Sequence, residues 1–406
     1  MMKRILALGA ILALLTGCGG GPKVTRSFGD DAAFLASQQY TVVLSDQHGQ
    51  AQVVVVPAYQ GRVMTSTAEG MGGQSFGWLN KELIASGRDE PHINAYGGEE
   101  RFWMGPEGGQ HGLFFQPMTP FDCEHWQAPR PLDNEPFDIH EKGNDRVEMR
   151  KRFELTNFAA TTLHVEVRRT VHLFSALQAW RELGALELAN PSLKMVGYES
   201  ANQVINVGKA PWRKENGLPS IWIVGMFPAS PAATAVAGIR ADGNPGPKMT
   251  SDAPVPADRL VEKNGVVFFR VDGQVRGRIG ISPKRTKGVM GCYDPESGTL
   301  TVVQFMPIEP AGAYVNSAWK IQEDPYAGDA ANIYNAGPVA GGKQLGQFYQ
   351  LESSSPALEL APGQSKTHIS RTYHIRGEAA TLDPVARKVL GVSLAEIEGA
   401  LPKSGK

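Results

Sequence analysis

The amino-acid sequence predicts an all-β fold built mainly of antiparallel strands. Short runs rich in Val, Ile, Thr, Phe and Tyr recur along most of the chain, and Gly, Pro, Asn and Asp bound them, which is typical of strands joined by turns. In one such run, residues 163–173, apolar side chains occupy the odd positions except Arg169, as a strand with one buried face requires. Helical patterns are few and short, so strands are expected to form the core.

The first residues have the pattern of an export signal. Lys3 and Arg4 precede an apolar run at residues 5–15 that is too short to span a bilayer as a stable helix. Residues 1–17 are therefore predicted to be a signal peptide.

The apolar run ends in Leu-Leu-Thr-Gly-Cys, which resembles the lipobox of bacterial lipoproteins. The resemblance implies that Cys18 is lipidated after cleavage and that residues 18–26 form a flexible tether. An Asp directly after the Cys retains such lipoproteins at the inner membrane. Gly19 stands there instead, which favours a lipid anchor in the outer membrane facing the periplasm. The alternative is an ordinary secreted protein with a chance Cys near the cleavage site.

The strand pattern recurs along most of the chain, for example at residues 40–45, 52–59, 62–67, 146–155, 161–173, 265–271, 277–282 and 366–375. A hairpin is predicted from residues 289–293 to 299–305, because Pro295 and Gly298 in the loop supply the dihedral angles that such a turn needs. Residues 228–256 are rich in Ala, Pro, Gly and Asp, which predicts a long surface loop.

Two short helices are predicted within the β-rich part of the chain. Asp30 or Asp31 is expected to cap the first, which runs through Ala36. Ser175 is expected to cap the second, over residues 176–183.

The pattern changes after residue 377. Residues 382–391 have a helical pattern, and Ser393 with Glu396 forms a plausible capping box that opens a last helix. Residues 378–406 are therefore predicted to be a helical, peripheral tail, which leaves residues 27–377 as one large β domain.

The charge of the chain is nearly balanced, with 40 Lys and Arg against 41 Asp and Glu. Such a balance provides neither the basic surface of a nucleic-acid-binding protein nor an acidic tail. We therefore expect no nucleic-acid partner.

Two cysteines remain after Cys18, namely Cys123 and Cys292. An oxidising periplasm permits them to pair, but the sequence does not show whether their Cα atoms come within bridging distance. Their spacing is not that of a zinc site.

Residues 94–115 concentrate more chemistry than any other segment. Gly pairs that let the backbone approach a ligand surround an Arg, a His, a Trp and three carboxylates: Arg101, His111, Trp103, Glu99, Glu100 and Glu107. Charge-assisted hydrogen bonds beside a flat apolar ring suit a polyol such as a sugar. The alternative is a pair of Gly-rich turns whose charged residues pair with one another.

An ordered series of weak motifs resembles the galactose mutarotase-like superfamily, the aldose epimerase-like proteins, and within it uncharacterised bacterial lipoproteins. The resemblance rests on residues 96–103, 106–107, 109–112, Trp212, 221–222, 315–319, 324–329, 351–352 and 362–363. The resemblance covers most of residues 40–376. It implies an antiparallel β-supersandwich with few short helices, and a mono- or oligosaccharide as partner.

The resemblance also implies catalytic residues. The family carboxylate that takes the proton from the anomeric hydroxyl lies shortly before a Pro-Gly turn, a place that Glu352 occupies here; the alternative is a strand-edge carboxylate facing water. Gln203 stands where the family has its catalytic His, and an amide cannot act as a general acid. His111, or one of the glutamates Glu99, Glu100 and Glu107, is therefore expected to supply the proton. Two carboxylates facing one sugar would also permit glycoside cleavage.

Further residues are candidates for holding the sugar. Arg62 and Arg101 suit a hydroxyl or the carboxylate of an acidic sugar, although each could instead pair with a nearby carboxylate. Tryptophans are candidate stacking platforms, although aromatic residues are more often core. The full set of substrate-binding candidates is Arg62, Glu99, Arg101, Trp103, Trp222, Asn202, Asn316, Trp319 and Asp324.

Residues 316–335 are dense in oxygen ligands and lack strong periodicity. They could bind Ca²⁺ through Asp324, Asp329 and Asn332, or cover the sugar cleft, or form a loop whose side chains satisfy its own backbone. The spacing is not that of an EF-hand, and no cofactor is expected.

The sequence as a whole predicts a lipid-anchored protein that binds a sugar and acts on it by acid/base chemistry, either anomer interconversion or glycoside cleavage. A non-catalytic glycan-binding lipoprotein is the alternative. The two differ in whether His111 or a glutamate of residues 94–115 lies beside Glu352.

Overall fold

The computed structural model describes residues 26–240, 248–249, 255–338, 342 and 344–402. The predicted signal peptide, Cys18 and the tether up to residue 25 lie outside the described residues, so these assignments stay predictions. In the described part of the chain, no helix is both long and apolar enough to cross a bilayer.

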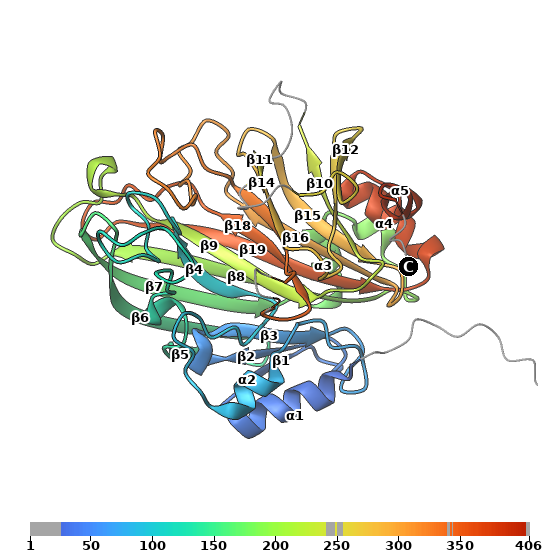
Figure 1. The fold of residues 1–406 in the computed structure, drawn as a ribbon. Coiled ribbons are helices and arrows are strands. Elements are labelled where there is room, and N and C mark those ends of the chain that lie inside the picture. The colour runs from blue at the N-terminus through green and yellow to red at the C-terminus, as the bar shows by residue number, and fades with distance from the viewer. Residues whose placement is uncertain (1–25, 241–247, 250–254, 339–341, 343, 403–406) are drawn as a thin grey trace, which may run out of the picture.

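Three antiparallel sheets form the core of the protein (Figure 1). The largest has ten strands in the order β12, β13, β10, β15, β16, β19, β8, β7, β6, β5. In chain order its strands are β5 (Asp138–Lys142), β6 (Arg146–Thr156), β7 (Thr162–Leu173), β8 (Lys194–Asn206), β10 (Thr234–Ile239), β12 (Leu260–Lys263), β13 (Val266–Arg270), β15 (Thr286–Asp294), β16 (Thr299–Met306) and β19 (Ser365–Arg376).

The second sheet has six strands in the order β11, β14, β17, β18, β9, β4. These are β4 (Arg101–Gly105), β9 (Ser220–Pro228), β11 (Lys248–Met249), β14 (Gly277–Ile281), β17 (Ala331–Asn335) and β18 (Phe348–Ser354). The third sheet has three strands: β1 (Val42–Ser45), β2 (Gln52–Val56) and β3 (Arg62–Thr67).

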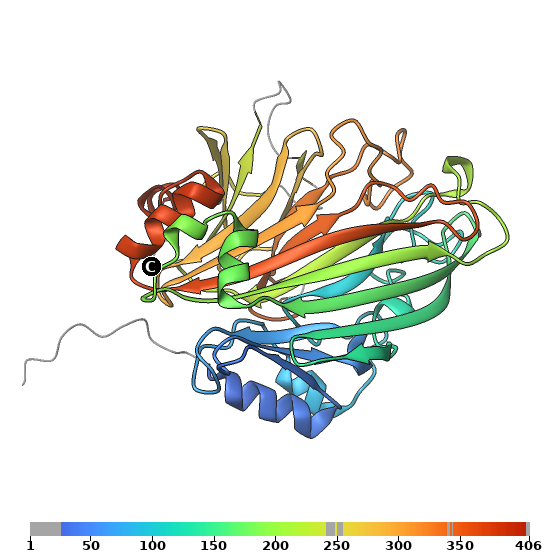
Figure 2. The same cartoon turned by 180° about the vertical axis from the view of Figure 1, so that it is seen from behind.

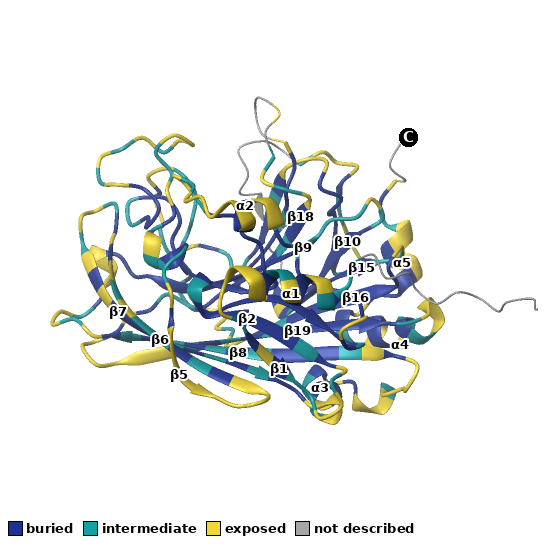
Figure 3. Cartoon of the chain, turned by 90° about the horizontal axis from the view of Figure 1, so that it is seen from below, coloured by how far each residue is buried: buried dark blue, intermediate teal, exposed yellow. Residues whose placement is uncertain are grey.

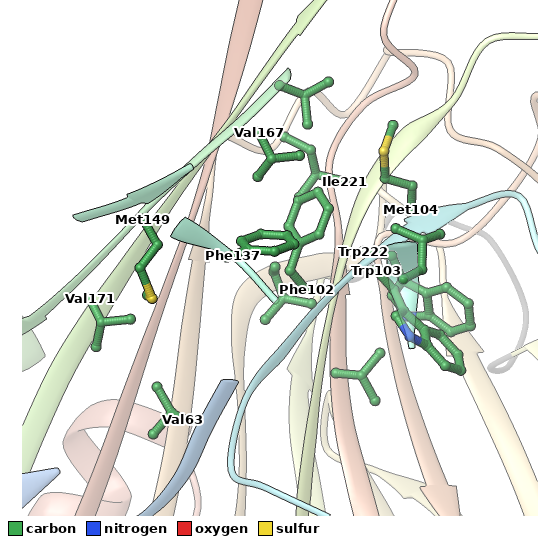
Figure 4. Close-up of a cluster of buried hydrophobic side chains, with 14 of the residues drawn as sticks. Val63, Phe102, Trp103, Met104, Phe137, Met149, Val167, Val171, Ile221 and Trp222 are labelled. Carbon is green, nitrogen blue, oxygen red and sulfur yellow. The ribbon is translucent and has the colours of Figure 1, made fainter. Parts of the chain in front are cut away.

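The ten-stranded and six-stranded sheets pack face to face. Phe102 of β4 and Ile221 of β9 lie in one buried cluster with Met149 and Val167 of the larger sheet (Figure 4). Side chains alternate along a strand, so the neighbours of Phe102 point to the opposite face of the six-stranded sheet. That outward face carries the site described below.

Helices lie at the edges of the sandwich. The helix α1 (Phe28–Gln38) and the short α2 (Lys81–Ser86) lie beside the three-stranded sheet, below the two large sheets (Figures 1 and 2). The outer side of α1 is exposed, whereas the strands β16 and β19 are mostly buried (Figure 3). The other three helices lie in the right-hand half of Figure 1. They are α3 (Ala176–Leu183), α4 (Ala379–Leu390) and α5 (Leu394–Gly399).

Most local predictions are confirmed. The strand at residues 163–173 is β7, the hairpin is the antiparallel pair β15 and β16, and Ser175 caps α3. The capping box of Ser393 and Glu396 opens α5. The tail packs its apolar side, Leu382, Val385, Ala386 and Leu390, into a core cluster with β10, β13, β15, β16 and β19.

Three local predictions are wrong. Ser27, rather than Asp30 or Asp31, caps α1. Strand β2 ends at Val56, because Pro57 lacks the N–H that a sheet needs and begins a 3₁₀ helix, Pro57–Tyr59. Strand β10 lies inside the segment expected to be a surface loop, where Ala235 and Val236 are fully buried. The open question of the disulfide is answered by two free cysteines, Cys123 exposed and Cys292 buried. The remaining 3₁₀ helices are Arg130–Leu132, Leu186–Leu188 and Lys214–Asn216.

Candidate functional site

Two carboxylates meet at one guanidinium on the outward face of the six-stranded sheet. Arg278 Nη2 donates to Glu352 Oε2 at 2.7 Å, and Arg278 Nη1 donates to Glu107 Oε2 at 3.2 Å. Each carboxylate also accepts from an indole, Glu352 from Trp222 at 3.0 Å and Glu107 from Trp126 at 2.9 Å. These five residues form what we call the Glu107–Glu352 centre.

Strand register brings the members of the centre together. Glu352 lies opposite Val224 of β9, which lies opposite Arg101 of β4, so all three side chains share one face of the sheet. Trp222 and Trp103 are also direct partners on that face. Arg278 comes from β14, two strands beyond β18. The face is therefore assembled from four different strands.

Two chain segments cover this face, residues 106–126 and residues 316–326. Residues 106–126 continue from β4, and the backbone N–H of Glu107 donates to Ser317 Oγ at 3.1 Å. Gln110 Nε2 donates to the carbonyl of Gln322 at 2.9 Å, and the N–H of Gln322 donates to Gln110 Oε1 at 3.0 Å. A Cβ at Gly108 would lie 2.8 Å from the carbonyl oxygen of Ala318, so Gly108 permits this close approach.

The centre is largely shielded from water. The side chain of Glu352 is 2% exposed, that of Glu107 is 11% exposed and that of Arg278 is 17% exposed. Burial raises the pKa of Glu107 despite Arg278, and the nearby charge of Glu352 raises it further. Burial alone would lower the pKa of Arg278, but Glu352 and Glu107 raise it. Glu107 therefore takes up a proton more readily than an exposed glutamate.

Aromatic rings line the centre. The ring centroids of Trp103 and Trp222 lie 5.0 Å apart, and the two indoles lie side by side in Figure 4. Trp126 stacks against Phe114 at 5.6 Å and against Trp319 at 6.3 Å. Trp103 and Trp222 are buried, whereas Trp126 and Trp319 are partly exposed. The two partly exposed indoles are the ones that a sugar could reach from solvent.

Arg101 adds a second cation to the same face. Its guanidinium carbon lies 3.6 Å from the centroid of the Trp103 ring. Burial lowers the pKa of Arg101 to about 9. Of the candidate residues, the structure thus brings together Glu107, Glu352, Arg101, Trp103, Trp222 and Trp319.

Other candidates lie in the interior of the protein. Glu99 is fully buried, and its Oε2 accepts from Ser66 at 2.8 Å and from Tyr198 at 3.1 Å and lies 3.1 Å from His374 Nε2. Such contacts satisfy one oxygen of Glu99 from inside the sandwich. The side chain of Glu99 is therefore shielded from solvent.

Glu100 and Asn202 share a buried partner. Arg169 Nη2 donates to Glu100 Oε1 at 2.8 Å, and Arg169 also bonds Asn202 Oδ1. Arg62, likewise fully buried, donates to the carbonyls of Gly97 at 3.0 Å and Asp133 at 3.1 Å. Contacts within the protein thus engage Glu100, Asn202 and Arg62 away from the Glu107–Glu352 centre.

His111 and Gln203 do not join the centre. The ring of His111 is partly buried and lies 6.3 Å from that of Tyr326, and burial lowers its pKa. No hydrogen bond or ion pair between His111 and Glu352 is present among the described residues. Gln203 bonds Ser365 Oγ at 3.1 Å on the outer face of the ten-stranded sheet, away from Glu352.

Side chains of the oxygen-rich segment, residues 316–335, hydrogen-bond to the backbone of the same segment. Asp324 Oδ1 accepts from the N–H of Tyr326 at 2.9 Å, and Asn316 Oδ1 accepts from the N–H of Ala318 at 3.1 Å. Asn332 lies in β17 opposite Glu352, and Asp329 lies just before that strand. The described residues contain no group of three or more His, Cys, Asp or Glu placed to hold a metal ion.

Arg278 and Trp126 were not among the site residues predicted from the sequence. A signal for Arg278 was present, because it is the one charged residue in the predicted strand 277–282, between Gly and Ile residues. A charge in such a strand needs a partner. Trp126 carried no comparable signal.

One buried histidine makes the stability of the protein sensitive to acid. His368 is fully buried in β19; Nε2 lies 2.9 Å from Ser353 Oγ, and Nδ1 has no partner. Burial lowers the pKa of His368 to about 3. An unfolded His titrates near 6.5, so the stabilisation from neutral His368 is complete above that pH and is lost as the pH falls towards 3.

The unfolding free energy of the wild-type protein should fall between pH 7 and pH 4.5. We expect this fall to be smaller by about 2 to 3 kcal/mol in His368→Gln. Urea unfolding at both pH values measures this difference, and His48→Gln, at an exposed histidine, is the matched control. An unchanged pH dependence in His368→Gln would contradict the assignment.

Comparisons with known proteins place the fold but not the activity. Residues 26–401 match a family model described as "Family of unknown function (DUF6786)". No curated protein sequence matches the chain.

Solved structures share the fold at low identity. A protein described as a "Putative aldose 1-epimerase", from Escherichia coli K12, has a TM-score of 0.50 and 14% identity, covering 84% of this chain and 99% of its own. A galactose mutarotase-like protein from Lactobacillus casei has a TM-score of 0.46 and 10% identity, covering 83% of this chain and 100% of its own. The match at a TM-score of 0.50, together with the antiparallel sheets, confirms the galactose mutarotase-like β-sandwich that the sequence predicted.

Proposed function

The chain belongs to the family of unknown function DUF6786, and we propose that this member acts on a sugar by acid/base chemistry at Glu107 and Glu352. The observation that carries the proposal is the pair of shielded carboxylates on Arg278, within a wall of tryptophans. The fold shared with aldose epimerase-like proteins supports a sugar as the substrate class. Two carboxyl groups in one site can divide the roles of acid and base when their surroundings differ.

The surroundings of the two carboxylates do differ. Glu107 has a raised pKa and lies on a covering segment, so it suits the acid that gives a proton to a ring or glycosidic oxygen. Glu352 accepts two charge-stabilising hydrogen bonds, from Arg278 and Trp222, and suits the base. In anomer interconversion, Glu352 takes the proton of the anomeric hydroxyl while Glu107 protonates the ring oxygen. The bond from that oxygen to the anomeric carbon breaks, and the reverse transfers close the ring on its other face.

A panel of mono- and oligosaccharides tests the proposal. The experiment uses the chain from residue 26 onwards, with proton NMR for anomer exchange, chromatography for cleavage and calorimetry for binding. Anomer exchange or cleavage above the uncatalysed rate supports the proposal. Binding without either reaction identifies the glycan-binding alternative, and an absence of both binding and turnover contradicts a sugar ligand.

We also propose that the protein is anchored in the bacterial outer membrane through Cys18 and faces the periplasm. The support is the sequence of residues 14–18, which resembles a lipobox. Cys18→Ser in the full chain is expected to move the protein from the membrane fraction to the soluble fraction of the periplasm, because the acyl chains provide the anchor. Immunoblotting of the separated fractions measures this shift, with Cys123→Ser as control. Retention of Cys18→Ser in the membrane would contradict the anchor.

A further inference from the structure

Arg101 is a buried cation without an acceptor. Its residue exposure is 2%, and Nε and Nη1 are buried with no hydrogen-bond partner. Among the described residues, the guanidinium makes no hydrogen bond or ion pair, and it lies over the face of Trp103. A buried guanidinium in this condition is unusual, because taking a charge out of water is costly unless an opposite charge compensates.

The other fully buried arginines show the contrast. Arg169 bonds the carboxylate of Glu100, and Arg62 bonds two backbone carbonyls and the side chain of Gln60. Arg101 has neither kind of partner. Its lack of an acceptor is therefore a property of this position rather than of buried arginines in the protein generally.

Arg101 lies at the Glu107–Glu352 centre. It shares a cross-strand row with Glu352, with Val224 between them. Arg278 is bonded to both carboxyl groups of the centre, and when Glu107 carries the proton proposed above, Glu352 alone balances the charge of Arg278. Asp133, Glu352 and Glu107 act on Arg101 only through space, without a hydrogen bond. The positive charge of Arg101 is thus left over on the face where the sugar is proposed to react.

We propose that the sugar recognised by this protein carries a carboxylate, as a uronic acid does, and that Arg101 binds it. The inference rests on the function proposed above, since it names the substrate class of the same site. A neutral hydroxyl could accept a hydrogen bond from Arg101 but would leave its charge uncompensated. A carboxylate supplies both the acceptor and the charge, and its plane matches that of a guanidinium stacked on an indole.

Calorimetry on the wild-type chain from residue 26 provides the first test. Glucuronate and galacturonate are compared with their uncharged amides, with glucose and galactose, and with the two hexose 6-phosphates. We expect one uronate to bind at least about tenfold more tightly than its amide and its hexose, as a charge-assisted hydrogen bond in a buried site provides. The 6-phosphates are expected to bind no better than the hexoses.

Two variants assign the effect to Arg101. Arg101→Met keeps an unbranched apolar side chain but removes the guanidinium and its charge, and it is expected to lose the uronate preference while still binding the hexose. Arg88→Met, at a side chain that is 67% exposed, is the matched control and should retain the preference. Melting temperatures of both variants show that the comparison is made on folded protein. If Arg101→Met does not fold, the comparison of uronate with amide on the wild-type protein still decides whether the site recognises a carboxylate.

The outcomes separate this inference from the proposed function. Equal binding of uronate, amide and hexose, or a preference for the phosphates, contradicts the recognition of a carboxylate. Either result still supports a sugar as the ligand. A uronate preference that persists in folded Arg101→Met overturns the role of Arg101. Failure of every sugar to bind contradicts the proposed function and this inference together.

Discussion

Glu352→Gln is expected to lower turnover of the sugar substrate by about 10²- to 10⁴-fold while changing its dissociation constant by no more than a few fold. The amide retains the shape of Glu352 and an oxygen that can accept from Trp222, so the bound sugar should keep its place. It cannot take a proton, because an amide is not basic at neutral pH. The loss should therefore fall on turnover rather than on binding.

The measurement pairs steady-state kinetics on the best substrate of the panel with calorimetry. Glu323→Gln is the matched control, because Glu323 is exposed in the covering segment of residues 316–326. Glu107→Gln is expected to reduce turnover as well and to remove the high-pH limb of the activity profile, where a neutral Glu107 loses its proton. Wild-type turnover by folded Glu352→Gln would rule out this residue as the base.

Arg169→Met is expected to destabilise the protein by about 3 to 5 kcal/mol. The substitution leaves Glu100 as an unpaired carboxylate inside the sandwich, where Arg169 and Glu100 have side chains 0% and 2% exposed. Burial already raises the pKa of Glu100, which shows how poorly this position tolerates a charge. Removing the counter-charge is therefore more harmful than removing the pair.

A double-mutant cycle in urea measures this asymmetry. Glu100→Gln combined with Arg169→Met is expected to recover much of the lost stability, because neither buried charge remains. Arg168→Met is the control on the same strand, with a side chain 42% exposed in an ion pair to Glu166, and should cost less than about 1 kcal/mol. A loss below about 1 kcal/mol in Arg169→Met would show that the pair contributes little.

Only some of the predicted site residues lie close together in the structure. Glu107, Glu352, Arg101 and Trp103 come together, but Glu99 and Glu100 turn inwards although they are adjacent in sequence to Arg101. Alternation along the strand turns Glu100 to the side opposite Arg101, and Glu99 lies before β4 begins, where its carboxylate finds interior donors. A dense stretch of charged residues therefore divides between a buried network and an outward face, and the sequence does not show where the division falls.

The sequence by itself determined the fold class and many of the strands, short helices and turns, because these depend on alternation, capping and backbone preferences within a few residues. Arg169 already stood out as the charged member of an apolar face. Only the tertiary structure decided which charges meet: Arg278 lies 171 residues from Glu107 and 74 residues from Glu352. Such contacts depend on the register of six strands and on two covering segments. The same packing left Arg101 without an acceptor, a fact that no local pattern could contain.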